Sequence, residues 1–308
     1  MPASPSIVGI GVSVLDSICS LERFPKHGEV VRAHDRVDSI GGGITVALAT
    51  AARLGSKALL IDALGDDSAS DSIIKRLSDE GVETRLIERL VGETASTASI
   101  WSDLETSERT IVYCPGSACD HIEWKPLLVD TIAGASILHL NGRHPEICKR
   151  AIEVAKQHQT TISFDGGAHR YRDEILPMLR DSEVVIVARH FAACHCNSIQ
   201  NSVGHEPTTA ELAAILMNDL QCAIVGVTDG ERGSNWVTAN QTFHQPAIDT
   251  QDAIDTTGCG DSFHGAFLHG LVSGMGVRES AALAAKVASV NARSIGGLGN
   301  WSRRDVLP

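Results

Sequence analysis

Short runs of aliphatic and β-branched residues alternate along most of this chain with longer stretches in which apolar residues recur every three or four positions. Runs of the first kind predict buried strands, because a parallel strand is covered on both faces. Stretches of the second kind predict helices with one apolar face. The expected strands are 6–14, 58–63, 136–140, 161–164, 184–187 and 223–227, and the helices between them are 68–80, 145–158, 173–180 and 208–220. This alternation indicates an α/β fold with a mostly parallel sheet and helices on both faces.

Two segments interrupt the alternation. Residues 17–40 are short polar and β-branched pieces, and residues 98–113 are typical of a hairpin that turns near residues 105–108. Together they predict a small sheet that stands off the main body. No internal repeat or linker divides the chain, so we expect residues 1–308 to form one domain.

Three glycine-rich turns precede predicted helices, and the first lies at residues 41–43. Gly41, Gly42 and Gly43 lead into a helix expected at 44–54 that ends at Gly55. Glycines at such a place form either a flexible joint or a surface on which a substrate lies against the backbone, and the position directly before the helix favours the second. A second helix is expected after Gly274 and Gly276, at 279–293.

The remaining glycine-rich turn lies in residues 254–271, IDTTGCGDSFHGAFLHGL, and runs directly into an amphipathic helix. The amides of Gly258, Cys259 and Gly260 should open the first helical turn, where unpaired N–H groups and the helix dipole attract anions. Asp261 follows, and it can cap the helix, act as a base beside a transferring phosphate, or do both. The sequence therefore predicts the phosphate site of a kinase.

Polar side chains follow three of the predicted strands. Asp16 follows the first, Arg143 the strand at 136–140, and Asp165 the strand at 161–164. Ligands of open parallel sheets bind beyond the carboxyl ends of strands, so Asp16 is expected to bind substrate hydroxyls, the alternative being an ordinary loop acid. Arg143 either pairs with a phosphate or sulfonate of the substrate or forms a salt bridge with a surface acid.

Composition excludes several other classes. A net charge of -12 disfavours a nucleic-acid or anionic-membrane partner, and the early apolar run at 7–15 is too short to span a bilayer. The eight cysteines form no CxxC pair, which indicates reduced thiols in a cytoplasmic protein. Cys194 and Cys196 flank a histidine but lack a second pair at zinc spacing, which disfavours a metal site. P-loop, dinucleotide-binding, hydrolase and zinc-protease motifs are absent from the sequence.

The turn before the last long helices resembles a family signature. Residues 255–261, DTTGCGD, are similar to the D-T-x-G-x-G-D motif of the ribokinase-like (PfkB) sugar kinases, and residues 41–55 resemble the N-terminal G-G motif that ends in A-R-L-G. Val46 stands where many members have Asn. The resemblance implies the ribokinase-like three-layer fold, with the segments 17–40 and 98–113 forming a lid that is often a dimer surface. Around Arg143 the chain is similar to the sulfofructose kinases of this family and, more loosely, to its ketohexokinases.

The resemblance also implies an activity, namely ATP-dependent transfer of the γ-phosphoryl group to a hydroxymethyl group of a small sugar or sugar derivative. Asp261 would be the base, and the amides of residues 258–260 would form the anion hole. The remaining implied roles are sugar binding by Asp16, Gly41, Gly42, Gly43, Arg143, Asp165 and Asp261, ATP binding by Thr228, Gly230, Gly233, Thr257, Gly258 and Gly260, and K⁺ binding by Asp255 and Thr257.

One family motif is missing. The N-x-x-E motif that organises magnesium in many members is replaced by ARHFA at residues 188–192. Mg²⁺ is then expected to be held either mainly by the ATP phosphates and Asp261 or through other acids that the sequence does not identify. The missing motif and the missing Asn leave two alternatives open. The chain is a nucleoside kinase of the same family, or a sugar or nucleotide sensor without catalysis.

Overall fold

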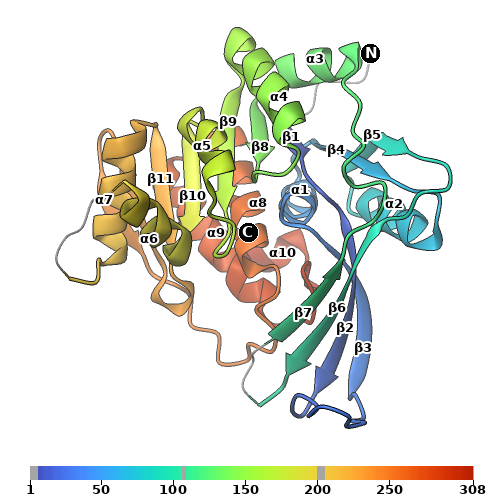
Figure 1. The fold of residues 1–308 in the computed structure, drawn as a ribbon. Coiled ribbons are helices and arrows are strands. Elements are labelled where there is room, and N and C mark those ends of the chain that lie inside the picture. The colour runs from blue at the N-terminus through green and yellow to red at the C-terminus, as the bar shows by residue number, and fades with distance from the viewer. Residues whose placement is uncertain (1–5, 106–108, 200–204, 308) are drawn as a thin grey trace.

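The computed structural model describes residues 6–105, 109–199 and 205–307, which build a large sheet, a small sheet and the helices around them (Figure 1). The large sheet has nine strands in the order β13-β12-β11-β10-β9-β8-β1-β4-β5. Seven of them are parallel, whereas β12 and β13 pair antiparallel to their neighbours. The strands are β1 (Ile7–Ile10), β4 (Ala58–Leu64), β5 (Glu83–Arg89), β8 (Ile137–Leu140), β9 (Thr161–Gly166), β10 (Val184–Ala188), β11 (Ile224–Thr228), β12 (Ser234–Thr238) and β13 (Thr242–Gln245).

Helices cover both faces of this sheet, and an apolar core lies under each layer. One core joins the sheet to α1 (Gly43–Leu54), α2 (Ser68–Asp79), α8 (Cys259–Val272), α9 (Val277–Asn291) and α10 (Arg303–Val306). The other joins the opposite face to α3 (Pro126–Ala133), α4 (Pro145–His158), α5 (Leu176–Arg180), α6 (Arg189–Ser198) and α7 (Thr209–Leu220). Strands covered on both faces need apolar residues at nearly every position, and β1 and β4 are buried throughout.

The small sheet projects from one side of this body (Figure 1). Its strands run in the order β3-β2-β6-β7, with β2 at Val14–Leu21, β3 at Asp35–Gly41, β6 at Ser96–Asp103 and β7 at Arg109–Cys114. The edge strand β7 is exposed along its whole length. The turn expected near residues 105–108 lies mostly outside the described residues.

The α/β fold predicted from the hydrophobic pattern is confirmed, with local corrections. The single strand expected at 6–14 is wrong, because the chain leaves the large sheet after Ile10 and enters the small sheet at Val14. The helix expected at 173–180 begins as a 3-10 turn at Asp173–Ile175. Pro177 has no N–H to donate to the carbonyl of Asp173, so an α-helix cannot start there.

Among the described residues, no helix combines the length and apolar character needed to cross a membrane. All eight cysteines are free thiols. Cys194, Cys196 and the histidine between them lie on α6, and no group of three metal-binding side chains occurs in the described part of the chain.

Candidate functional site

The predicted phosphate turn lies at the N-terminus of α8. Gly258 precedes the helix with φ +69°, a left-handed conformation that favours glycine, and a Cβ there would lie 2.5 Å from the Cα of Gly297. A Cβ on Gly260 would meet no atom within 4 Å, so the turn faces open space. The expected set of three free amides needs one correction, because the amide of Cys259 donates a long hydrogen bond of 3.3 Å to the carbonyl of Thr256. The amides of Gly258 and Gly260 have no backbone partner among the described residues outside the helix.

Asp261 begins the same helix and faces a second carboxylate. Burial and the nearby charge of Asp165 raise the pKa of Asp261. Asp165, at the end of β9, accepts a hydrogen bond of 2.9 Å from Nη1 of Arg170 and lies 3.4 Å from Nε2 of His264. Although burial alone would raise its pKa, His264 and Arg170 lower the pKa of Asp165. Two neighbouring carboxylates with pKa values displaced in opposite directions are typical of acid–base sites.

The glycines at the end of β3 and the start of α1, Gly41 to Gly43, bring this helix against the same groups. A Cβ on Gly43 would lie 2.8 Å from Oδ1 of Asp261 and 2.9 Å from Nη2 of Arg170. Gly42 has φ +94° and leaves no room for a Cβ beside the carbonyl of Val12. The N-termini of α1 and α8 therefore meet around Asp261, and the glycines are required by close backbone approach.

Asp16 belongs to the site but not in the predicted way. It lies within β2 of the small sheet, rather than in a loop after a strand of the large sheet. Its carboxylate packs directly against Gly41, where a Cβ would overlap it. Burial, reinforced by the charge of Asp261, raises the pKa of Asp16 to about 7. Asp16, Asp165 and Asp261 thus approach one another from three different elements.

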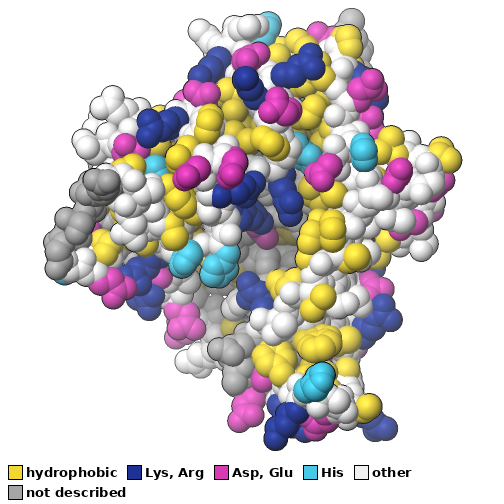
Figure 2. All heavy atoms as spheres, in the orientation of Figure 1, with side chains coloured by type: hydrophobic (Ala, Val, Ile, Leu, Met, Phe, Trp, Pro, Cys, Tyr) yellow, Lys and Arg dark blue, Asp and Glu magenta, His cyan; other side chains and the backbone are white. Residues whose placement is uncertain are grey.

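Arg143 follows β8 and is exposed beside the small sheet. Its guanidinium carbon lies 5.9 Å from the ring centre of Tyr113 on β7. No salt bridge joins Arg143 to an acidic side chain within the described ranges, so the surface-acid alternative finds no support. Figure 2 shows a hollow between the α/β body and the small sheet, with Lys and Arg side chains gathered beside it.

The residues expected to line the nucleotide site form a tight turn between β11 and β12. Thr228 pairs with Ser234 across this antiparallel connection, and the turn between them is closed by Asp229, which forms two hydrogen bonds with Arg232. Gly230 and Gly233 have φ values of +53° and +80°, which the turn requires. The segment that follows β13 packs on Gly233 and leads to the phosphate turn.

Asp255, expected to help bind a monovalent cation, is buried before the phosphate turn. Its Oδ1 accepts hydrogen bonds from the amide and hydroxyl of Thr257, at 2.9 Å and 2.7 Å, and its Oδ2 accepts one from the amide of Gly296 at 2.9 Å. These donors are neutral, and no salt bridge reaches Asp255 in the described part of the structure.

Asn291 and Arg53 hold the loop that closes over the phosphate turn. Asn291 donates to the carbonyl of Thr257 at 3.3 Å and accepts from the amide of Gly299 at 2.7 Å. Arg53 donates to the carbonyl of Gly299 at 2.6 Å and pairs with Glu80 at 2.6 Å. The arginine of the A-R-L-G segment therefore supports the site from outside it.

The sequence did not single out four residues that the structure places at the site. Arg170 and His264 contact Asp165, and His139 lies under His264 with ring centres 5.7 Å apart. The fourth, Arg109 of β7, reaches the phosphate turn. His264 follows Asp261 by three positions, which places both on one side of a helix and was a usable signal. Arg109 gave no such signal, because its place depends on the register of β7.

The replaced motif at 188–192 forms the end of β10 and the start of α6. Arg189 pairs with Glu206 at 2.8 Å and lies 3.8 Å from Asp229.

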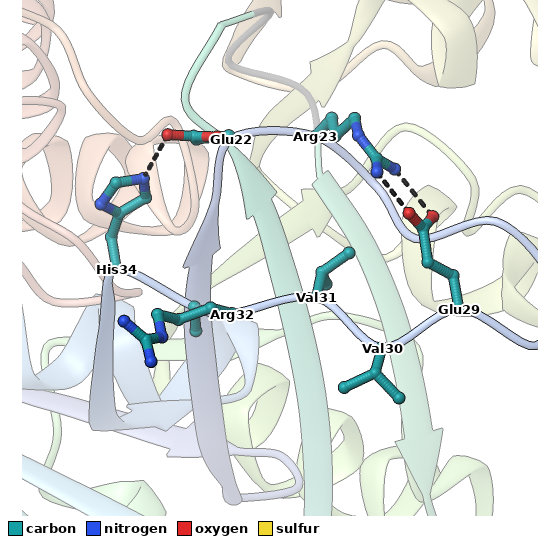
Figure 3. Close-up of a pocket in the computed structure, with 8 residues that line it drawn as sticks. Glu22, Arg23, Glu29, Val30, Val31, Arg32 and His34 are labelled. Atoms are coloured by element: carbon teal, nitrogen blue, oxygen red, sulfur yellow. Dashed lines mark hydrogen bonds and ion pairs between the residues drawn. The ribbon is translucent and has the colours of Figure 1, made fainter.

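A separate hollow of about 370 Å³ lies within the loop between β2 and β3 at the outer end of the small sheet. As Figure 3 shows, its walls are held by the pairs Arg23–Glu29 and Glu22–His34, and none of the catalytic candidates lines it.

Comparisons with known proteins show which sequences and folds this chain is similar to. The model of the pfkB family carbohydrate kinases matches residues 5–302. A deoxyribokinase of Salmonella typhi is 26% identical over 274 residues, covering 85% of this chain and 84% of its own length. A nucleoside kinase of Methanothermobacter thermautotrophicus is 23% identical, covering 94% and 90%. The crystal structure of a putative ribokinase from Agrobacterium tumefaciens superposes with a TM-score of 0.86 at 21% identity, covering 99% of this chain and 96% of the other.

Proposed function

Because the chain belongs to the pfkB family of carbohydrate kinases and is an ATP-dependent kinase, we propose that its acceptor is a hydroxymethyl group of a sugar or sugar derivative. The observation that carries this proposal is the position of Asp261. It lies at the N-terminus of α8, directly after a glycine turn that faces open space, and its pKa is raised while that of Asp165 is lowered.

Catalysis in this proposal consists of positioning and charge stabilisation. Asp261 takes the proton of the acceptor hydroxyl, whose oxygen attacks the γ-phosphorus as the bond to the bridging oxygen of ADP breaks. The amides of Gly258 and Gly260 bind phosphoryl oxygens at the helix N-terminus. When bound with ATP, Mg²⁺ supplies further charge neutralisation. It keeps several waters and needs only one or two carboxylates beside the phosphates, which fits the presence of Asp261 here.

The acceptor would lie between the glycines before α1 and the acids around them. Asp16 and Asp165 are buried carboxylates next to Gly41 and Gly43, and carboxylates accept hydrogen bonds from neighbouring sugar hydroxyls. The lowered pKa of Asp165 keeps it ionised for this task. Gly42 keeps the backbone close to the ligand.

We further propose that the preferred acceptor carries a negative charge, bound by Arg143. The support is an exposed guanidinium beside the hollow with no acidic partner among the described residues. Arg143→Ala should raise the KM of an anionic sugar derivative about tenfold or more, because a hydrogen bond to a charged group is lost. The KM of a neutral sugar should change by less than about twofold. Arg150→Ala, which removes an arginine packed on Trp124, is the matched control. Equal effects of Arg143→Ala on both acceptors would exclude the charged subsite.

ATP would lie along the turn of Thr228, Gly230 and Gly233, with its phosphates at Thr257, Gly258 and Gly260. The support is the continuous path of the chain from Gly233 to the phosphate turn.

A monovalent cation such as K⁺ is proposed at Asp255 and Thr257. The support is a buried carboxylate that receives only neutral hydrogen bonds, and the measurable consequence is faster turnover in K⁺ than in a large organic cation.

The small sheet is proposed as a lid and as the surface of a homodimer. Trp101 and Val112 lie on one face of β6 and β7 and expose 39% and 58% of their surface, whereas Ile111 and Tyr113 lie on the other face and expose 51% and 38%. The Trp101 and Val112 face is the proposed dimer surface. Sedimentation of the wild type and of Val112→Lys would test this interface.

One experiment tests the central proposal. ADP release is measured with ATP and a panel of neutral sugars, anionic sugar derivatives and nucleosides, with and without Asp261→Asn. Acceptor-dependent ADP release with a sugar that disappears in Asp261→Asn is the expected result. Preference for a nucleoside would favour the nucleoside kinase, and binding of sugars without any ADP release would indicate a sensor.

A further inference from the structure

Arg109 connects the small sheet to the phosphate turn. It is the first residue of β7, the edge strand, and its Nη1 donates a hydrogen bond of 2.7 Å to the hydroxyl of Thr256. Thr256 precedes Gly258 by two positions. In Figure 1 the start of β7 lies beside the segment that enters α8. The small sheet therefore places a cation at the mouth of the anion-binding turn.

The charge of Arg109 acts on the reacting groups. Among the causes that act on the pKa of Asp261, Arg109 lowers it against the dominant effect of burial, and it acts in the same direction on Cys259. No salt bridge joins Arg109 to an acidic side chain within the described ranges. Thr256 is neutral, and its hydrogen bond uses one of the five N–H groups of the guanidinium.

An arginine is not needed if the contact with Thr256 only holds β7 against the phosphate turn. A hydrogen bond between two neutral side chains would hold β7 to the turn equally well, and an exposed arginine loses more side-chain entropy on ordering than a short side chain. A phosphate, in contrast, is the ligand that a guanidinium binds through two parallel N–H groups.

We propose that Arg109 is a catalytic residue that binds the γ-phosphoryl group during transfer. The inference rests on the proposed kinase site at Asp261. As the acceptor oxygen bonds to the γ-phosphorus, the bond to the bridging oxygen breaks and its electron pair stays on ADP. The hydroxyl proton goes to Asp261. Arg109 exchanges no proton and neutralises charge on the phosphoryl oxygens.

The placement of Arg109 also links acceptor binding to phosphoryl transfer. Asp16, on β2 of the same sheet, lies on the acceptor side, and Arg109 on β7 lies on the phosphate side. One sheet therefore carries both an acceptor contact and a phosphate contact.

The test compares five variants in kcat, in KM for both substrates and in melting temperature. Arg109→Ala should lower kcat about 10- to 100-fold, with KM for the acceptor within about threefold, and Arg109→Lys should be intermediate. Thr256→Val removes the hydrogen bond but keeps the charge, so it should lower kcat much less than Arg109→Ala does. Arg36→Ala removes an exposed arginine from β3 of the same sheet and should match the wild type. Added guanidinium ion should restore part of the activity of Arg109→Ala but not that of Asp261→Asn.

Two results would overturn the proposal. If Arg109→Ala and Thr256→Val lower kcat equally and guanidinium restores no activity, Arg109 only holds β7 against the phosphate turn. If Arg109→Ala changes the KM of the acceptor at unchanged kcat, it acts in binding alone. Wild-type protein without acceptor-dependent ADP release would instead refute the kinase site itself, which separates the two failures.

Discussion

Replacing each glycine of the phosphate turn by alanine should have a different effect: Gly258→Ala should lower the stability of the fold, and Gly260→Ala should lower the activity. Gly258 has φ +69° and touches the backbone of Gly297, whereas the space above Gly260 is open in the protein. Gly258→Ala forces an L-residue into the left-handed region, at about 1–2 kcal/mol, and overlaps a backbone segment, at about 1–3 kcal/mol more. The free energy of unfolding should drop by about 2–5 kcal/mol.

Gly260→Ala should leave the fold intact and still impair the reaction. Residue 260 lies in the first turn of α8, where alanine is at least as good a helix former as glycine. A methyl group there can meet only a bound ligand. Loss of one hydrogen bond to a charged phosphoryl group corresponds to about 1.5–3 kcal/mol, which is about a 10- to 150-fold fall in kcat/KM for ATP.

The assay pairs thermal melting with coupled ADP release. Gly258→Ala should lower the melting temperature by about 5 °C or more, and Gly260→Ala should leave it unchanged or raise it slightly. Gly276→Ala is the control, because this glycine before α9 has φ -66° and its Cβ would come no closer than 3.6 Å to another atom. Wild-type turnover by Gly260→Ala would show that the open space is not where the phosphate binds.

Three further outcomes follow from the same geometry. Asp261→Asn should bind ATP like the wild type in calorimetry but lose about 10²- to 10⁴-fold in kcat, and unchanged kcat would remove its role as base. Because the pKa of Asp16 is raised to about 7, protonation below that pH removes the negative charge of the proposed acceptor contact and turns one of its two accepting oxygens into a donor. The kcat/KM for the acceptor should therefore fall as pH decreases from about 8 to about 6, and a flat profile would contradict this. Arg53→Ala should destabilise the fold by about 2–3 kcal/mol, because it breaks a largely buried ion pair with Glu80. The control Lys75→Ala breaks an exposed ion pair and should change stability by less than about 0.5 kcal/mol. Equal melting temperatures of the two variants would refute this contrast.

Local sequence patterns predicted those features that depend on nearby residues. The helix at Pro145–His158 has the predicted bounds, and α1 begins within one residue of its expected start, since apolar periodicity and flanking glycines fix both. The phosphate turn was recognisable because glycine, acid and helix follow one another directly. Strands β12 and β13 were not predicted, because neither is a continuous apolar run.

Features that depend on strand register could not be predicted. Asp16 was assigned to a strand end, but the chain crosses to the small sheet first, and no periodicity marks that crossing. The neighbours of Arg143 and Arg109 come from β7 and from the turn before α8, which are distant in sequence. Such pairs depend on tertiary packing, which a single sequence does not report.

Charge placement explains how a chain with a net charge of -12 can bind a nucleotide polyphosphate. Long-range repulsion between exposed charges is screened beyond about 8 Å in physiological salt, so affinity depends on the groups inside the hollow. Arg170 compensates Asp165 there, and in the proposed complex the amides of the phosphate turn and the cation of Arg109 would face the phosphates. Because Asp16 and Arg109 both belong to the small sheet, a body without that sheet would lack an acceptor contact and a phosphate contact together. The proposed acceptor contact and the proposed phosphate contact therefore depend on the same element of the fold, so a substitution that displaces the small sheet should impair both substrates together.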